Sequence, residues 1–135
     1  MSKLKTLSVK RIDHVAIVVA NLEATRYFYE KVLGMTVTTR PNVGFDGLWL
    51  AAGNTYIHVI VKHDESGEPG MPSFTGTRES RGHHISFVVE DATIALEQFK
   101  KFNIPLCSGP HQRADGATQL FVYDPDNYII EIYSE

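Results

Sequence analysis

An internal repeat constrains the fold of this chain more than any other feature of its sequence. The segment HVAIVVANLEATRYF, which starts at His14, aligns with HISFVVEDATIALEQF, which starts at His84. Further along, YIHVI at 56–60 aligns with IIEIY at 129–133. The offset between the two copies drifts only from 70 to 73 residues. Self-similarity at a nearly constant spacing predicts two copies of one supersecondary module.

Each copy combines one strand, one helix and about three further strands. The first helix is predicted from Asn21, a good N-cap, to Gly34, which suits the left-handed turn that ends a helix. The second is predicted from Asp91 to Asn103 for the same reasons. The other strands are expected at 35–40, 45–52, 54–62, 104–109, 117–123 and 128–133. The predicted fold class is therefore α+β, built from two repeated βαβββ modules.

The length of 135 residues predicts one domain that spans the chain. Its first module covers about residues 9–62, and its second covers about 81–135. Between them, residues 63–80 are rich in Gly, Pro and Ser and show no hydrophobic periodicity. Such a segment is a linker or a mobile flap, and the linker is the simpler interpretation.

Composition excludes several classes of function. The formal net charge is −3, so no basic surface for nucleic acid or anionic membrane is expected. No apolar run approaches the roughly 20 residues of a membrane span, and the N-terminal residues lack a signal-peptide pattern. The single cysteine, Cys107, cannot form an internal disulfide. We therefore expect a cytoplasmic protein whose partner is a small molecule.

Strand parity selects one histidine in each copy. Side chains alternate between the two faces of a strand, so Val15 and Ile17 share the face that a helix covers, while His14 points to the other face. The repeat makes His84, and not His83, the counterpart of His14. Two equivalent histidines on equivalent faces suggest a shared role.

The same test singles out a second pair, His58 and Glu131, each flanked on both sides by apolar residues. A carboxylate inside such a strand is costly to bury unpaired. If the sheets of the two modules face each other across a pseudo-twofold axis, His14, His58, His84 and Glu131 can converge. Three imidazoles and one carboxylate suit Fe, Zn, Ni, Co or Mn. These four residues are the predicted ligands of one divalent metal ion, with further positions left for water or substrate.

Four stretches, in this order and spacing, resemble the vicinal oxygen chelate superfamily. They are DHVAIVVANLEATRYFYEKVLGM from 13, YIHVI from 56, RGHHISFVVED from 81 and LFVYDPDNYIIEIY from 120. The superfamily includes glyoxalase I, methylmalonyl-CoA epimerase, extradiol dioxygenases, fosfomycin-resistance thiol transferases and bleomycin-resistance proteins. The resemblance covers nearly the whole chain. It implies paired βαβββ modules that form a curved mixed sheet around a metal cavity, with His14, His58, His84 and Glu131 as ligands.

The resemblance implies a metal-dependent enzyme of lyase, isomerase or dioxygenase type. Its substrate would be a small oxygen-rich molecule chelated to the ion, and Glu131 would be the catalytic residue that moves a proton. A homodimer is also expected, with the site built either within one chain or from modules of both chains. Tyr56, Ser86 and Tyr133 share strand parity with the ligands and are candidate cavity residues.

Two positions depart from the family pattern. Asn127 replaces the glycine of the usual DPDG turn, and asparagine tolerates the left-handed conformation better than most residues. In glyoxalase I, the position that matches His58 typically carries a glutamate, so the resemblance does not extend to the pair of ligand glutamates that handles the substrate protons of glyoxalase I.

The alternative to an enzyme is a non-catalytic binding protein of the bleomycin-resistance type. Such relatives generally lack the metal ligands, so metal content separates the two. A fosfomycin-type thiol transferase is a further alternative, although neither its potassium loop nor its cluster of phosphonate-binding cations is identifiable here.

Overall fold

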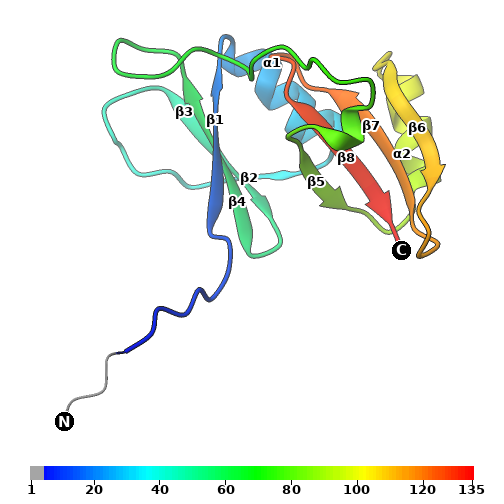
Figure 1. Ribbon diagram of the computed structural model, residues 1–135. Coiled ribbons are helices and arrows are strands. Elements are labelled where there is room, and N and C mark those ends of the chain that lie inside the picture. The colour runs from blue at the N-terminus through cyan, green and yellow to red at the C-terminus, as the bar shows by residue number, and fades with distance from the viewer. Residues whose placement is uncertain (1–4) are drawn as a thin grey trace.

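The computed structural model describes residues 5–135, and its elements follow the repeat (Figure 1). Those of the first module are β1 His14–Val19, α1 Leu22–Arg26, η1 Tyr27–Val32, β2 Thr36–Thr38, β3 Gly47–Ala52 and β4 Thr55–Val61. After the short 3₁₀ turn η2 Glu79–Arg81, those of the second are β5 Ile85–Val88, α2 Ala92–Lys101, β6 Leu106–Gln112, β7 Thr118–Tyr123 and β8 Ile129–Ser134. No helix among these described residues has the length and apolar character needed to cross a bilayer.

Each module forms its own four-stranded mixed sheet with the same topology. The strand order is β1-β4-β3-β2 in the first sheet and β5-β8-β7-β6 in the second. In both, the first strand pairs in parallel with the last, and the other neighbours are antiparallel. The predicted α+β class with two repeated βαβββ modules is confirmed.

The first predicted helix is present, but it changes geometry part-way. Asn21 caps α1 by accepting a hydrogen bond from the Ala24 amide at 2.9 Å. The helix then widens in η1, where the Leu33 amide donates to the Phe28 carbonyl five residues earlier. It ends at Gly34, whose φ of 72° is the left-handed conformation expected there.

The strand predicted at 104–109 is shifted toward the C-terminus. β6 continues to Gln112 because its register with β7 slips twice, between Leu106 and Ser108 and between Ser108 and His111. Gly109 lies in the second irregularity at a φ of 94°. A bulge lets the strand bend without losing its partner, and the residue pattern of LCSGPHQ does not alternate enough to predict that.

The helix-side faces of both sheets contribute to one core. Ile57 and Val59 of β4 lie in the same buried cluster as Ile130 and Ile132 of β8. Figure 1 shows α1 between the two sheets, and Phe28 of the adjoining η1 is a member of this cluster. Because side chains alternate along each strand, the residues between these apolar positions point away from the core. This applies to His58 in one sheet and to Glu131 in the other.

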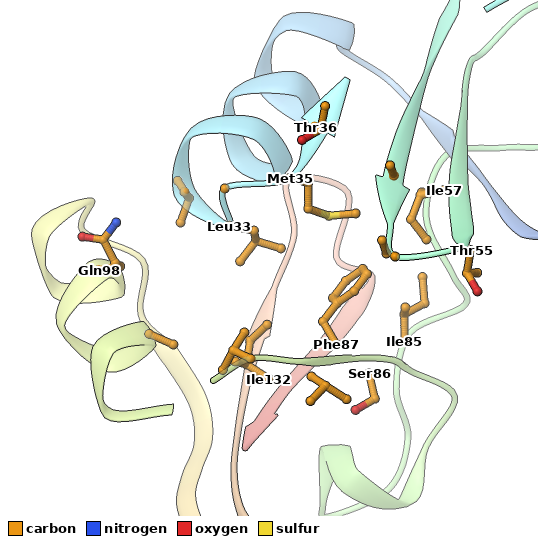
Figure 2. Close-up of a pocket in the computed structure, with 18 of the residues that line it drawn as sticks. Leu33, Met35, Thr36, Thr55, Ile57, Ile85, Ser86, Phe87, Gln98 and Ile132 are labelled. Atoms are coloured by element: carbon orange, nitrogen blue, oxygen red, sulfur yellow. The ribbon is translucent and has the colours of Figure 1, made fainter. Parts of the chain in front are cut away.

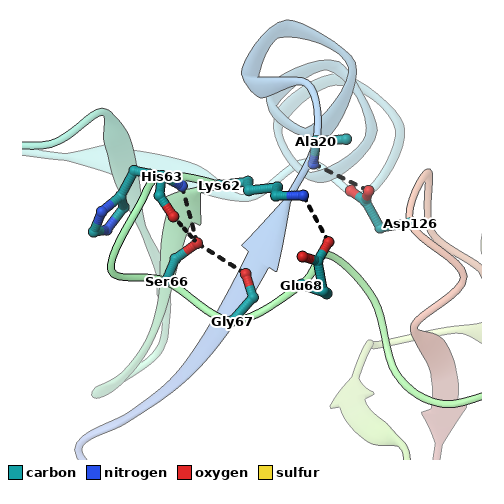
Figure 3. A network of polar contacts seen from close by, with 7 residues as sticks. All are labelled: Ala20, Lys62, His63, Ser66, Gly67, Glu68 and Asp126. Carbon is teal, nitrogen blue, oxygen red and sulfur yellow. Dashed lines mark hydrogen bonds and ion pairs between the residues drawn. The ribbon is translucent and has the colours of Figure 1, made fainter.

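The second module also forms hydrogen bonds with the C-terminal end of β1. The Tyr128 hydroxyl donates to the Val18 carbonyl at 2.9 Å and accepts from the amides of Val18 and Gly70 at 3.0 and 3.1 Å. Asp126 accepts a hydrogen bond from the Ala20 amide at 3.1 Å (Figure 3). These bonds tie β1, the connecting segment and the turn before β8 together.

The connecting segment that follows β4 has its own polar contacts, which Figure 3 shows beside β1. Lys62 pairs with Glu68 at 2.7 Å. The Ser66 hydroxyl accepts from the His63 amide at 2.9 Å, and it lies 3.0 and 2.8 Å from the carbonyl oxygens of His63 and Gly67. The start of this segment is therefore an ordered turn.

Candidate metal centre

Two of the predicted ligands, His14 and His58, lie side by side on the first sheet. His14 begins β1 and His58 lies in the middle of β4, its parallel neighbour. Their rings are stacked, with centroids 3.8 Å apart and planes 13° from parallel. Trp49 of β3, directly opposite His58 in the register, stacks on the other face of His58 at 4.1 Å and 3°. The three rings form a column on the sheet face turned away from the core.

Asp13 joins this group, which sequence reasoning did not anticipate. Its Oδ2 lies 2.8 Å from Nδ1 of His14, and its Oδ1 forms an ion pair with Arg11 at 3.0 Å. Ligand atoms of Asp13, His14 and His58 lie within 4.8 Å of one another, the only such trio of His, Cys, Asp or Glu among residues 5–135. The signal was present in the sequence as a carboxylate directly before the first histidine.

The environment of His58 favours a neutral ring. Burial is the main cause that lowers the pKa of His58 below its ordinary value, and the charge of His14 lowers it further; Asp13 opposes this shift, and Arg40 adds the smallest lowering effect. A neutral imidazole has the lone pair that a metal ligand needs.

The other two predicted ligands, His84 and Glu131, meet on the second sheet. Nε2 of His84 lies 3.1 Å from Oε1 of Glu131, and Nδ1 of His84 lies 2.8 Å from the Gly82 carbonyl oxygen. The Gln119 amide donates to Oε2 of Glu131 at 2.7 Å. Glu131 is 5% exposed, so this buried carboxylate has one oxygen held by Gln119 and the other directed at His84.

This second pair fits a shared divalent ion. A carbonyl oxygen only accepts hydrogen bonds, so the Gly82 carbonyl requires the proton of a neutral His84 ring to be on Nδ1. The lone pair is then on Nε2, which faces the carboxylate of Glu131. Nε2 of His84 and Oε1 of Glu131 are 3.1 Å apart, and an imidazole nitrogen and a carboxylate oxygen are both ligand atoms that divalent ions accept. Gly82 and Gln119 would then be the outer partners that orient these two ligands.

Within one chain the two pairs do not form one site. Among the described residues, no three of His14, His58, His84 and Glu131 have ligand atoms within 4.8 Å of one another. The cause is the packing of the modules, because the sheets share one core through their helix-side faces. The structure therefore presents two half-sites, each on a face turned away from that core.

Other candidates take different places. His83 is exposed and lines a second hollow with residues of the connecting segment, such as Phe74. Tyr56 lies 6.4 Å from the His58 ring, beside the first half-site. The Arg113 guanidinium lies over the Tyr133 ring, with its central carbon 4.9 Å from the ring centroid. Ser86 is opposite Glu131 in the register of β5 and β8, and it also lines the cleft described next.

A large cleft of about 1130 Å³ opens between the modules, away from the imidazole column. Figure 2 shows Leu33, Met35, Ile57, Phe87 and Ile132 pointing into it, from both modules. Its walls are mainly apolar, and Ile57 belongs to the helix-side face of its sheet rather than to the face of His58. The predicted ligand His84 also lines this cleft, whereas His14 and His58 do not, so the cleft adjoins the second half-site and not the first.

Comparisons with known proteins agree with this architecture. Residues 11–132 match the family model described as the Glyoxalase/Bleomycin resistance protein/Dioxygenase superfamily. The chain belongs to this superfamily. The predicted resemblance is confirmed by a match that includes all four proposed ligands.

Several members of the superfamily are similar to this chain along most of its length. Glyoxylase I 4 of Arabidopsis thaliana is 26% identical over 93% of this chain and 71% of its own. Ethylmalonyl-CoA/methylmalonyl-CoA epimerase of Cereibacter sphaeroides is 32% identical over 87% of this chain and 91% of its own. The crystal structure of a putative glyoxalase family protein from Bacillus anthracis superposes with a TM-score of 0.76, at 24% identity over 97% and 99% of the two chains.

Proposed function

We propose that this protein is a divalent-metal-dependent enzyme whose complete site forms between two copies of the chain. His14 and His58 of one copy and His84 and Glu131 of the other would hold one ion. The observation that carries the proposal is the 3.1 Å separation of Nε2 of His84 and Oε1 of Glu131, each backed by its own hydrogen-bond partner. Fe, Zn, Ni, Co and Mn all accept such a ligand set.

Exposed apolar surface supports the homodimer. Ile12, Val88 and Ile94 border the cleft of Figure 2 and are 66%, 60% and 58% exposed. β1 and β5 are edge strands of their sheets, so each has one side free of a strand partner in the described chain. Contiguous exposed apolar surface beside unpaired strand edges marks a protein interface. A second copy is the partner that also completes both half-sites.

We propose that the reaction belongs to the lyase, isomerase or dioxygenase type, with proton transfer next to a carbonyl group favoured. The relatives named as epimerases and as a glyoxylase support that preference. A bound divalent ion supplies a Lewis acid for a substrate with two neighbouring oxygens. Gln119 keeps Oε2 of Glu131 in place, so Oε1 is the oxygen that would hold the ion or, once released from it, accept and return a proton. His14 and His58, on the first sheet of the other copy, would supply the remaining two ligands.

Complementation between two defective variants tests the shared site. One variant carries His14→Ala and His58→Ala, and the other carries His84→Ala and Glu131→Gln. Neither homodimer is expected to bind Co²⁺ tightly. A heterodimer formed by mixed refolding contains one site with all four ligands, so it is expected to bind one ion per two chains.

The control is a mixture of each variant with itself, which must remain without tight binding. If the heterodimer also fails to bind while the native protein binds Co²⁺, the ligands are not shared in this way. If the native protein neither contains nor binds a divalent metal, the enzyme proposal is wrong and the protein is a metal-free binding module of the bleomycin-resistance type.

A further inference from the structure

The first half-site has two neighbours that are outside the predicted ligand set, Asp13 and Trp49. We propose that both are positioning residues: Asp13 fixes the ring nitrogen that His14 presents, and Trp49 fixes the ring plane of His58. This inference rests on the proposed function, because it concerns the imidazoles that would bind the ion. Neither Asp13 nor Trp49 would contact the metal.

The geometry around His14 sets its tautomer. An ionised carboxylate accepts hydrogen bonds and donates none, so the 2.8 Å contact between Asp13 Oδ2 and Nδ1 requires the proton on Nδ1. The neutral ring then carries its lone pair on Nε2. Arg11 holds the other carboxylate oxygen at 3.0 Å, which limits rotation of the Asp13 side chain.

The second module supports this assignment independently. The repeat partner of His14 is His84, whose Nδ1 faces the Gly82 carbonyl oxygen at the same distance of 2.8 Å. Each half-site thus has an acceptor at Nδ1 that leaves the lone pair on Nε2, although one acceptor is a side chain and the other is backbone. The equivalent arrangement at His84 argues that Asp13 orients its histidine and does not itself bind the ion.

Trp49 acts on His58 through stacking. The indole and imidazole planes are 3° from parallel and 4.1 Å apart, while His14 covers the opposite face of His58 at 3.8 Å. A ring held between two others cannot tilt without losing one contact. The alignment has a cause in the sheet, because Trp49 and His58 are directly paired on β3 and β4. Preorganised ligands bind a metal more tightly than free ones.

The first test measures the tautomer in the metal-free protein. Long-range ¹⁵N–¹H NMR on the native chain is expected to show His14 with its proton on Nδ1. In Asp13→Ala the proton is expected to move largely to Nε2, while the matched exposed variant Asp64→Asn leaves His14 unchanged. An unchanged tautomer in Asp13→Ala would overturn the inference, whatever the metal measurements show.

The second test measures Co²⁺ affinity and the visible absorption of bound Co²⁺. Asp13→Ala is expected to weaken binding by about 10- to 100-fold, the usual effect of losing an outer-shell partner. Asp13→Asn keeps a side-chain oxygen to accept the Nδ1 proton, so it should lose less affinity and leave the absorption bands unchanged. Altered bands in Asp13→Asn would identify Asp13 as a direct ligand and contradict a positioning role.

Trp49 is tested with a conservative pair of variants. Trp49→Phe keeps an aromatic plate against His58 and is expected to retain most of the affinity, whereas Trp49→Leu should lose about 10-fold. Equal affinities for Co²⁺ in the native protein and Trp49→Leu would remove Trp49 from the inference. Because Trp49 is the only tryptophan in the chain, its fluorescence also reports ion binding directly in the Asp13 variants. A native protein that binds no Co²⁺ defeats the proposed function, and the NMR test still decides the role of Asp13.

Discussion

At the scale of single residues, adjacent histidines have different surroundings. His84 has an acceptor at each ring nitrogen, Gly82 on one side and Glu131 on the other. His83 is exposed at the edge of a separate hollow. One residue of displacement along an extended chain reverses the direction of the side chain, which is why only one of the two faces the carboxylate.

We predict that His84→Ala lowers divalent-metal affinity at least about 100-fold, since it removes one ligand and leaves Glu131 without its partner. The matched variant His83→Ala is expected to bind like the native protein. Isothermal titration with Co²⁺ or Zn²⁺ distinguishes them. Equal affinities in both variants would disprove the parity argument.

Cys107 is a residue whose chemistry follows from its surroundings. Burial, followed by the charge of Glu79, raises the pKa of the Cys107 thiol to about 11. The thiolate is the reactive form, and a shift of two pH units makes it about 100-fold scarcer at pH 8. We predict that iodoacetamide reacts with Cys107 about 100-fold more slowly at pH 8 than with a model peptide thiol.

The sign of the pH dependence provides a check on Cys107. Because the thiol pKa is raised, the alkylation rate should keep increasing up to about pH 11, rather than level off near pH 9. Glu79→Gln removes the neighbouring negative charge and should shift the whole profile to lower pH. A profile that levels off near pH 9 in the native protein would contradict the prediction.

At the scale of elements, the sheet that carries the imidazoles depends on the close approach of its strands β3 and β4. Gly47 of β3 faces the Val59 carbonyl of β4, and a Cβ at Gly47 would clash with that oxygen. No side chain fits there without separating the strands. Trp49 and His58 belong to the same strand pair, so their stacking depends on this contact.

Gly47→Ala is therefore predicted to destabilise the fold by about 1–3 kcal/mol, in the range of overpacking in a well-packed site. Gly67→Ala is the control, because a Cβ there meets no atom within 4 Å. Urea unfolding followed by Trp49 fluorescence measures both. A Gly47→Ala midpoint equal to that of Gly67→Ala would refute the steric argument.

At the scale of the whole molecule, the packing of the two modules decides how the site can be completed. A single core lies under both sheets, so each half-site lies on a sheet face turned away from that core. In the proposed dimer, a second copy would cover the exposed apolar surface near Val88 and supply the missing ligands. Assembly and metal binding should therefore be lost together.

We predict that Val88→Asp raises the dimer dissociation constant at least about 100-fold, since a carboxylate at a buried contact costs several kcal/mol. Metal affinity should fall with it. Val43→Asp is the matched control, because Val43 is also exposed, at 46%, but is not among the residues that line the cleft. Sedimentation velocity at micromolar concentration measures the change, and a native protein that sediments as a monomer would contradict the proposed assembly.

The sequence by itself determined the repeat, the α+β class and the pairing of equivalent residues. These depend on local geometry: strands alternate with a period of two, and Gly34 and Asn103 end helices because they tolerate a positive φ. Parity could therefore place His14 with His58 and His84 with Glu131 on the face opposite the helix. Nothing beyond neighbouring residues and the offset of the copies was needed.

Only the tertiary structure decided how the two sheets meet, and hence that the half-sites are separate in one chain. It also brought Trp49 onto His58, placed Gln119 on Glu131 and inserted the bulges of β6. The physical reason is that such contacts join residues from different strands, whose relative positions depend on packing of the complete core. Alternation along a strand specifies which face a side chain occupies, and the burial of apolar surface from both modules specifies what that face meets.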